Sequence, residues 1–412
     1  MPTYQRCTKC RVCEGAQLEP VLSFGNMPLA NAFLTQEGLN EPEPTYPLEV
    51  VFCSSCSLVQ LTVSVPPEQI FREYLYFSSF SDAMLRHSQN VVQRLISERE
   101  LDEGSLVVEV ASNDGYLLQY FVESGIPVIG IEPAYNVALV AEERGIPTVT
   151  EFFDAELAGR LRSQGDGADV LIANNVLAHV PDLAQFVEGI RILLKEDGVA
   201  VIETPYIKDL VDGCEFDTIY HEHRCYYSLT ALDRLFRQHE LRIADVERLK
   251  IHGGSLRLYV THPEAAGKEQ SVESMLKQEK QLGLQTLEYY RNFSAKVERL
   301  TTALSDSLGK LKANGCHVAG YGAAAKGTVL LNACGLDNEI VDFVVDRNDN
   351  KQGRYIPGCR IPISPPARLL EAMPDYVLIL IWNLAEEIQE QQAEYHRRGG
   401  KFIVPIPKIS II

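Results

Sequence analysis

The stretch that decides the fold of this chain is residues 106–115, which read LVVEVASNDG. Its largely apolar first half suits a buried strand, and the Asn-Asp-Gly at its end suits a tight turn that opens a helix. Such a turn brings backbone N–H groups to a ligand and points the helix dipole at it. Ala111 and Asn113 stand where glycines are usual, and asparagine tolerates the left-handed conformation well. The stretch predicts a nucleoside-binding strand–turn–helix unit.

Short apolar runs on either side of this unit alternate with helical periods. This alternation predicts βαβ units and a parallel sheet. The runs are 128–131, 169–173 and 198–203. A further run at 255–261 is expected to close the sheet as an antiparallel edge strand. Residues 264–314 read as helical, and a second α/β pattern starts at residue 317 and continues through 340–345 and 376–381.

The N-terminal segment is rich in cysteine, with half of the ten cysteines in the first 56 residues. In a cytosolic protein such crowding favours metal binding over disulfides. The pairs Cys10/Cys13 and Cys53/Cys56 supply the four thiolates of a closed tetrahedral zinc site, which predicts a structural metal. Cys7 with Cys10 is also a valid pair. Gly15 favours Cys10 with Cys13, because it eases the turn of the knuckle.

The chain is therefore expected to have three parts. These are a zinc-binding domain at 1–77, a nucleoside-binding α/β domain at 78–252 and a second Rossmann-like α/β domain at 253–412. The net charge of −18 argues against a nucleic-acid partner, and no apolar stretch is long enough for a bilayer. The N-terminus lacks the apolar core of a signal peptide, so we expect a cytoplasmic protein, and nothing indicates more than a monomer.

The choice of cofactor depends on the first turn and on the end of the second strand. Glu132 ends that strand, where a carboxylate can accept hydrogen bonds from both ribose hydroxyls. The missing glycines disfavour a dinucleotide, whose pyrophosphate needs close backbone approach, and favour S-adenosylmethionine, which has no phosphate. The candidate cofactor-binding residues are Glu109, Ala111, Asn113, Asp114, Gly115, Glu132, Pro133, Asn174 and Asn175.

Residues 220–223, which read YHEH, follow the last parallel strand of this predicted sheet. Ligands of open α/β folds bind outside the carboxyl ends of the strands, so the segment is placed to cover the cofactor. Its side chains supply an acid, a base and a hydrogen-bond donor. Glu222 is expected to hold the second ring nitrogen of His223. A metal site and a hydrogen-bonded structural loop remain the alternatives.

The motifs of this chain, in this order, resemble those of the sugar C-methyltransferases of deoxysugar and antibiotic biosynthesis. The matching motifs are the two cysteine pairs and residues 19–22, 28–33, 76–79, 113–115, 175–181, 220–223 and 320–327. The sequence departs from the family at Arg224 and Cys225, where an apolar residue and a serine are commoner.

The resemblance implies a class I methyltransferase fold that binds S-adenosylmethionine. It implies that the substrate is a thymidine-diphospho-4-keto-6-deoxysugar (dTDP-sugar), which is methylated at C3′. His223 is then the general base, with Tyr220 and Glu222 positioning the sugar or the base. The other residues expected to line the catalytic site are His179, Tyr74 and Tyr76.

The loop at 320–327 follows an apolar strand and is expected to open a helix. Lys326 and the helix N-terminus are placed to meet the diphosphate of the substrate. The candidate substrate-binding residues are Gly322, Ala323, Lys326, Asp346, Lys351 and Arg354. Trp382 and Asn383 end a further strand and could touch a ligand. The alternative is a Rossmann-like scaffold without a ligand.

Three other functions compete with this interpretation. A NAD-dependent enzyme is disfavoured because neither turn carries GxGxxG. An O- or N-methyltransferase needs no carbon acid, so exchange of the C3′ proton with solvent separates it from a C-methyltransferase. A zinc-knuckle module for RNA is disfavoured by the acidic charge and the lack of a basic aromatic face.

Overall fold

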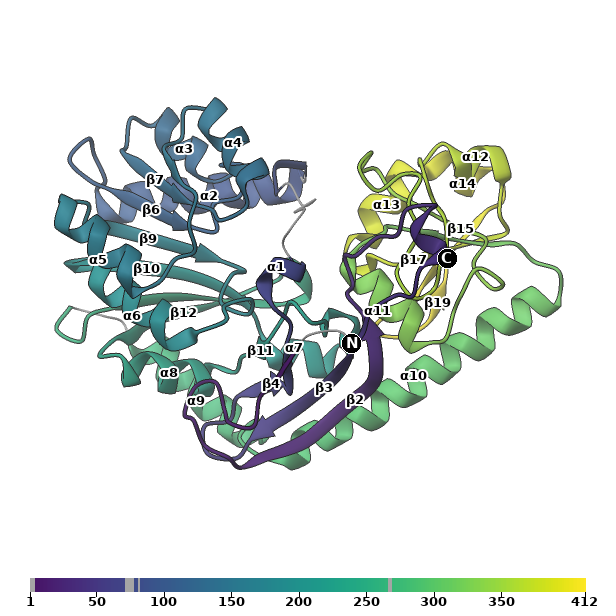
Figure 1. Cartoon of the computed structure of the whole chain (residues 1–412), viewed down its shortest axis with the longest axis horizontal. Coiled ribbons are helices and arrows are strands. Elements are labelled where there is room, and N and C mark those ends of the chain that lie inside the picture. The colour runs from purple at the N-terminus through teal and green to yellow at the C-terminus, as the bar shows by residue number, and fades with distance from the viewer. Residues whose placement is uncertain (1–3, 71–77, 81, 266–268) are drawn as a thin grey trace.

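The computed structural model describes residues 4–70, 78–80, 82–265 and 269–412. Figure 1 shows the middle and C-terminal parts of the chain as two lobes that lie side by side. The N-terminal strands β2 (Leu18–Pro28) and β3 (Thr45–Cys53) and the long helix α10 (Leu287–Ala313) run beneath them (Figure 1). Among the described residues, no helix is long and apolar enough to cross a membrane.

The middle lobe is built on a seven-stranded sheet of order β12-β13-β10-β9-β6-β7-β8. Its strands are β6 (Val107–Val110), β7 (Val128–Ile131), β8 (Thr148–Val149), β9 (Ala168–Asn174), β10 (Leu194–Pro205), β12 (Arg242–Leu249) and β13 (Ser255–Thr261). Neighbouring strands from β10 to β8 are parallel, whereas β13 is antiparallel to β10 and to β12. This is the strand order of the class I methyltransferase fold, as expected.

One detail of this sheet differs from the sequence-based expectation. Strand β13 is antiparallel as predicted, but it lies between β10 and β12, and β12 forms the edge. The reason is that β13 is buried along nearly its whole length, with Leu256, Leu258 and Val260 at 0% exposure, which suits an interior strand. The sheet therefore continues past residue 252, where the middle domain was expected to end.

Helices flank both faces of this sheet (Figure 1). They are α2 (Asp82–Arg99), α3 (Leu118–Glu123), α4 (Tyr135–Glu143), α5 (Ala155–Gln164), α6 (Leu183–Leu193) and α8 (Leu229–Gln238), whereas α7 (Ile207–Asp212) contacts α10. Polar residues start several of them. Asp154, Asp182 and Ser228 each accept a hydrogen bond from a backbone N–H of the first turn of α5, α6 and α8.

The N-terminal part is a four-stranded sheet of order β11-β4-β3-β2, with β4 at Val59–Leu61. Its outer strand β11 (Cys225–Tyr226) comes from the middle of the chain and pairs antiparallel with β4. A separate pair joins β1 (Gln5–Arg6) to β5 (Val63–Ser64). Because β11 directly follows residues 220–223, this candidate catalytic segment lies at the junction of the N-terminal and middle parts.

The C-terminal lobe has a six-stranded sheet of order β16-β15-β14-β17-β18-β19, and only β19 is antiparallel to its neighbour. Its elements are β14 (Val318–Tyr321), α11 (Ala325–Ala333), β15 (Phe343–Val345), β16 (Ile363–Ser364), α12 (Arg368–Ala372), β17 (Tyr376–Ile379), α13 (Ala385–Gln391), α14 (Ala393–Arg397), β18 (Lys401–Val404) and β19 (Ser410–Ile411). This is the second Rossmann-like α/β domain that the sequence predicts.

Helices α9 (Glu269–Leu282) and α10 join the two lobes. Glu279 on α9 is fully buried, and its carboxylate caps the N-terminus of α8. It accepts hydrogen bonds from Leu229 N at 2.7 Å and Thr230 N at 2.8 Å, and also from the Tyr206 hydroxyl at 2.9 Å. These charge-assisted bonds fix the connection to the middle sheet.

Candidate active site

The sulfur atoms of Cys10, Cys13, Cys53 and Cys56 lie within 4.8 Å of one another. Sγ of Cys10 is 3.3 Å from Sγ of Cys56, and Sγ of Cys13 is 3.6 Å from Sγ of Cys53. Four sulfurs at about 2.3 Å from a tetrahedral zinc ion are about 3.8 Å apart, so the cluster fits zinc. Sγ of Cys7 instead accepts a hydrogen bond from Arg11 Nη2 at 2.8 Å. The geometry therefore favours Cys13 over Cys7 as the partner of Cys10.

The turn after β6 adopts the conformation that its sequence predicts. Ala111, Asn113 and Gly115 have φ values of 57°, 51° and 76°, all in the left-handed region. This conformation costs a residue other than glycine about 1–2 kcal/mol, so the fold holds Ala111 and Asn113 against local strain. Asn175, after β9, also has a positive φ of 55°. Strained residues thus gather at the carboxyl ends of two neighbouring strands, where ligands of this fold bind.

Glu132 holds the turn in place from the end of β7. Its Oε2 accepts a hydrogen bond from Asn113 N at 3.0 Å, and its Oε1 accepts one from Ala134 N at 2.9 Å. Burial raises the pKa of Glu132, and the two backbone N–H groups oppose this rise. Each oxygen keeps a second lone pair, so the carboxylate can also accept from ribose hydroxyls.

Acidic and amide oxygens surround this turn. Glu109 is fully buried, and burial together with the charges of Glu132 and Asp114 raises its pKa well above the usual value. Within the described part of the chain, Oδ1 of Asp114 and Oδ1 of Asn174 are buried without a hydrogen-bond partner. Such acceptors match the amino group, hydroxyls and sulfonium charge of S-adenosylmethionine, so the residues present fit this cofactor.

The segment at 78–80 lies over the turn. Ser78 N donates to Oδ1 of Asn113 at 2.9 Å, and the Ser79 hydroxyl donates to Oδ2 of Asp114. Arg144 Nη1 donates to the Asp114 carbonyl oxygen at 2.7 Å. The side chains of Asn113 and Asp114 thus serve partly to hold the neighbouring chain. Tyr74 and Tyr76, which were expected in the catalytic site, lie outside the described residues.

His223 has a defined tautomer in the neutral state. Its Nδ1 lies 2.9 Å from the Thr218 carbonyl oxygen, which can only accept, so Nδ1 carries the proton. Nε2 is then the basic nitrogen, and the Tyr220 hydroxyl donates to it at 2.9 Å. The expectation that Glu222 holds the second ring nitrogen is wrong, because the Thr218 carbonyl occupies that position.

Glu222 contacts the N-terminal domain instead. Its Oε1 accepts a hydrogen bond from Nδ2 of Asn31 at 2.7 Å. Burial raises the pKa of Glu222 to about 7, although the bond from Asn31 opposes the rise. At neutral pH this side chain can therefore act as a proton donor or as a carboxylate.

His179 lies beside His223, with ring centroids 4.8 Å apart and an interplanar angle of 76°. Burial lowers the pKa of His179 well below the usual value, and the charges of His223 and Arg224 lower it further. A neutral His179 adds no positive charge next to the basic nitrogen of His223. The predicted residues His179, Tyr220 and His223 therefore come together in one place.

Arg224, one of the two departures from the family pattern, anchors this segment. Its backbone N donates to Ala178 O at 2.7 Å, and its Nη2 donates to Val65 O at 3.0 Å. Its own carbonyl oxygen accepts from Leu61 N at 3.0 Å. The residue after His223 thus joins the end of the β9 loop to the zinc-bearing domain.

Three of the predicted substrate residues meet at the start of α11. Ala323 N donates to Oδ2 of Asp346 at 2.7 Å, and Lys351 Nζ donates to the Ala323 carbonyl oxygen at 2.8 Å. Gly322 has a φ of 95°, and a Cβ there would lie 2.6 Å from Ile381, so only glycine fits. Arg354 belongs to the same loop, where its N donates to Lys351 O at 3.1 Å.

Lys326 does not join the contacts among Ala323, Asp346 and Lys351. Its Nζ donates to Oδ1 of Asn383 at 2.8 Å and lies 4.6 Å from the ring centroid of Trp382. Burial lowers the pKa of Lys326, and the carboxyl groups of Asp217 and Glu215 oppose this. Lys326 is therefore held beside the middle domain, apart from the contacts that join Ala323, Asp346 and Lys351.

The loop at 29–34 connects the residues around His223 to those at the start of α11, a role that sequence reasoning missed. Besides the bond from Asn31 to Glu222, the Ala30 carbonyl oxygen accepts from the Thr328 hydroxyl on α11 at 2.9 Å. Lys351 Nζ lies 5.3 Å from the ring centroid of Phe33. The sequence signal was present, since residues 28–33 form one of the family motifs, but no function was attached to it.

Comparison with known proteins agrees with this arrangement. The family model of the methyltransferase domain matches residues 84–246, that of the zinc binding domain matches 10–71, and that of the C-methyltransferase C-terminal domain matches 250–407. C-methyltransferase NovU of Streptomyces niveus is 38% identical over 406 residues, which cover 98% of this chain and 96% of that protein. This chain belongs to the C-methyltransferase family.

Two solved methyltransferases are also similar to parts of this C-methyltransferase. Magnesium protoporphyrin IX methyltransferase of Synechocystis with bound S-adenosylhomocysteine has a TM-score of 0.36 at 16% identity, over 43% of this chain and 83% of that chain. The glycopeptide N-methyltransferase MtfA has a TM-score of 0.35 at 10% identity, over 43% of this chain and 96% of that chain.

The family membership confirms the resemblance inferred from the motifs. The protein is an S-adenosylmethionine-dependent C-methyltransferase with a zinc-binding domain. The NAD-dependent enzyme and the O- or N-methyltransferase that competed at the sequence level are therefore not supported.

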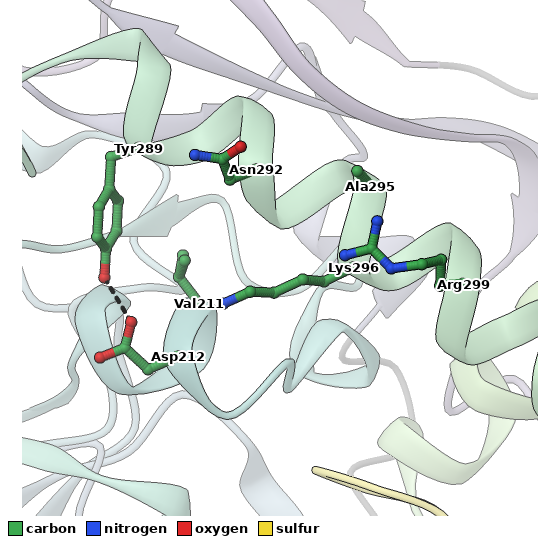
Figure 2. A pocket seen from close by; sticks show the side chains of 7 residues that line it. All are labelled: Val211, Asp212, Tyr289, Asn292, Ala295, Lys296 and Arg299. Carbon is green, nitrogen blue, oxygen red and sulfur yellow. Dashed lines mark hydrogen bonds between the residues drawn. The ribbon is translucent and has the colours of Figure 1, made fainter.

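A separate pocket of about 370 Å³ in this C-methyltransferase lies between α7 and α10 (Figure 2). Its lining residues are Val211, Asp212, Tyr289, Asn292, Ala295, Lys296 and Arg299. The Tyr289 hydroxyl donates to Oδ1 of Asp212 across one end of it at 2.9 Å (Figure 2). None of the candidate catalytic, cofactor or substrate residues lines this pocket, so we do not assign it to the methyl transfer.

Proposed function

We propose that this C-methyltransferase transfers a methyl group to C3′ of a dTDP-linked 4-keto-6-deoxysugar. The observation that carries the proposal is the fixed tautomer of His223, whose basic Nε2 faces Tyr220 while the Thr218 carbonyl holds Nδ1–H. A base held in this way suits a substrate that must lose a proton from carbon. The family resemblance of the motifs supplies the sugar and the position on it.

Carbon is a poor nucleophile unless a neighbouring carbonyl acidifies its proton. The 4-keto group of the proposed substrate does this for C3′. When the C3′–H bond breaks, the proton passes to Nε2 of His223, and the electron pair forms an enolate with most of its charge on O4′. The site therefore needs a base at C3′ and a hydrogen-bond donor at O4′.

The side chains around His223 fit these two tasks. In this proposal the Tyr220 hydroxyl turns from Nε2 to O4′ when the sugar binds, which frees the single lone pair of Nε2 to accept the C3′ proton. Glu222 in its protonated form is a second donor, because burial raises its pKa to about 7. His179 and, outside the described residues, Tyr74 and Tyr76 complete the lining in this proposal.

When bound, S-adenosylmethionine would supply the methyl group on its positively charged sulfur to the nucleophilic C3′, and cleavage of that carbon–sulfur bond would leave S-adenosylhomocysteine. In this proposal Glu132 receives the ribose hydroxyls of the cofactor. Ala111, Asn113 and Gly115 allow the backbone to approach it closely. The remaining residues proposed to surround the cofactor are Glu109, Asp114, Pro133, Asn174 and Asn175.

The nucleotide of the substrate is proposed to bind at the start of α11. Backbone N–H groups at this helix N-terminus and the cations Lys351 and Arg354 suit a diphosphate. Gly322, Ala323 and Asp346 shape the turn. Lys326 Nζ donates to Asn383 and keeps two further N–H groups that can donate to the diphosphate. We further propose that the enzyme acts as a monomer in the cytoplasm.

The test is to incubate the protein in deuterated water with a dTDP-4-keto-6-deoxysugar, with and without S-adenosylmethionine. Mass spectrometry and proton NMR of the sugar report the reaction. With S-adenosylmethionine, we expect a new methyl carbon at C3′. Without it, we expect the C3′ proton to exchange with solvent deuterium. His223→Ala should abolish this exchange. If neither methylation nor exchange is seen with any of the sugars, whether they carry an amino or a hydroxyl group at C3′, the assignment of the substrate is overturned.

A further inference from the structure

A hydrogen bond joins the C-terminal domain to the segment that precedes the YHEH residues. Trp382 begins the short helix η5 (Trp382–Leu384), and its Nε1–H donates to Oδ2 of Asp217 at 2.8 Å. Asp217 has 0% exposure and lies in the one-turn helix η3 (Phe216–Thr218) of the middle domain. A buried carboxylate that accepts from an indole N–H in another domain indicates a specific contact between the domains.

Lys326 reinforces this contact. Its Nζ lies 4.6 Å from the ring centroid of Trp382 and donates to Asn383, the neighbour of that indole. Helix α11, which carries Lys326, also packs against η3. Burial raises the pKa of Asp217 to about 6, while the charge of Lys326 and the hydrogen bond from Trp382 oppose the rise. At neutral pH these two partners therefore help to keep Asp217 ionised.

The residue after Asp217 holds the ring of His223. Thr218 contributes the carbonyl oxygen that accepts from Nδ1–H of His223 at 2.9 Å. The direction of this carbonyl depends on the backbone of η3, which is only one turn long. Within the described residues, Trp382 is the one side chain that donates a hydrogen bond to the Asp217 carboxylate. Movement of Asp217 therefore moves the group that sets the tautomer of His223.

We propose that Trp382 is a positioning residue for His223, because its bond to Asp217 holds the Thr218 carbonyl in place. The inference rests on the proposed function, in which His223 is the base. It gives the C-terminal domain a role in proton abstraction in addition to binding the nucleotide. His223 itself faces Tyr220, His179 and Tyr226 and lies next to Arg224 in the chain, and Trp382 is in the other lobe.

Trp382→Phe is the variant that tests the proposal. It removes the N–H donor and keeps an aromatic face beneath Lys326. We expect kcat for methylation of the keto-sugar to fall at least tenfold, with KM for the sugar and Kd for S-adenosylhomocysteine within threefold of wild type. If the bond between Trp382 and Asp217 only held the two domains together, its loss would change KM or the folding of the protein instead.

A second readout does not depend on the substrate. Long-range ¹H–¹⁵N spectra of the ¹⁵N-histidine-labelled protein report which ring nitrogen carries the proton, and His223→Gln assigns the signal. Wild type should show the Nδ1–H tautomer at His223. Trp382→Phe should show a mixture of tautomers or the Nε2–H form.

Two further substitutions keep the proposal testable if Trp382→Phe does not fold. Asp217→Asn retains an oxygen that can accept from the indole N–H, so we expect kcat within threefold of wild type. Asp217→Leu lacks this oxygen and should match Trp382→Phe. Glu43→Gln is the control, because Glu43 makes another contact with the C-terminal domain, accepting from Gly358 N at 2.9 Å, far from His223 in the chain.

The proposal is overturned if Trp382→Phe, or Asp217→Leu in its place, lowers kcat no more than Glu43→Gln does and leaves the His223 spectrum unchanged. A rise in KM alone, with unchanged kcat and an unchanged spectrum, also overturns it. If the wild-type protein methylates no keto-sugar, the proposed function fails, but the spectra still decide whether Trp382 sets the tautomer.

Discussion

Asn31 of the N-terminal domain donates a hydrogen bond to Oε1 of Glu222 at 2.7 Å. Asn31 is exposed and Glu222 is buried, so the amide reaches from the loop at 29–34 to a group beside the proposed base. Burial raises the pKa of Glu222 to about 7, and this bond is the interaction that opposes the rise.

Replacing Asn31 with alanine is therefore expected to raise the pKa of Glu222 further. The limb of the pH profile of kcat/KM that belongs to Glu222 should move to higher pH. The maximal rate should fall about tenfold, because loss of a hydrogen bond to an ionisable group costs about 1.5 kcal/mol. The measurement is the pH dependence of methylation between about pH 5.5 and 9.

Asn40→Ala is the matched control, since Asn40 is exposed in the same N-terminal domain and lies far from Glu222 in the chain. It should have the pH profile of the wild type. An unchanged profile for Asn31→Ala would show that the contact does not influence the ionisation of Glu222.

Cys7 and Cys53 offer a test of the zinc ligands. Cys53 belongs to the cluster of four sulfurs, whereas Sγ of Cys7 accepts from Arg11. We expect Cys53→Ser to lose the metal and to lower the melting temperature, because a structural zinc site contributes folding free energy. Cys7→Ser should retain one zinc per chain. Elemental analysis after gel filtration measures this, and loss of zinc from Cys7→Ser would contradict the assignment.

The parts of the fold that the sequence predicted are those that local chemistry determines. The left-handed turn at Ala111 and Asn113 follows from a short stretch after one strand. The spacing of Cys10 and Cys13 fixes a knuckle that only a second pair can complete. Parallel strands separated by helices have few arrangements, so the class I order could be expected as well.

What the sequence did not predict depends on contacts between distant residues. Asn31 and Glu222 are 191 residues apart in the chain, and no local pattern brings an amide to a carboxyl group over that distance. Lys326 was expected at a diphosphate because it lies at the start of a helix, but no local pattern shows that Asn383, 57 residues away, accepts its hydrogen bond. Strand β13 was placed at the edge, because periodicity shows that a strand exists but not where it enters the sheet.

Gly130 on β7 is packed against Ser112 in the turn after β6, so this position has no room for a side chain. A Cβ at this position would lie 2.6 Å from Oγ and 3.2 Å from Cβ of Ser112. Gly130→Ala should push Ser112 and the turn out of place and weaken S-adenosylhomocysteine binding about tenfold, or about 1.4 kcal/mol, in a calorimetric titration. Gly159→Ala is the control, because a Cβ there meets nothing within 4 Å. Equal binding by the two variants would show that Ser112 accommodates the methyl group.

Glu215 should make the stability of the protein depend on pH. It is 8% exposed, and burial raises its pKa to about 8, although the charge of Lys326 opposes the rise. Its pKa in the unfolded chain is about 4.3. A group whose pKa is raised on folding contributes stability that is fully present below the unfolded pKa. This contribution is lost as the pH rises through the folded pKa, here between about 4.3 and 8.

Glu215→Gln does not titrate, so it should avoid this loss. Its melting temperature should be close to that of the wild type at pH 5 and higher at pH 8.5. The expected gain is about 4 kcal/mol, or roughly 5 °C, measured by calorimetry in buffers of constant ionic strength. Glu142→Gln, an exposed position on α4, should show no such trend. If the difference between Glu215→Gln and wild type stays constant from pH 5 to 8.5, then Glu215 is ionised in the folded protein throughout this range. The charge of Lys326 would then outweigh burial at this junction of the two lobes.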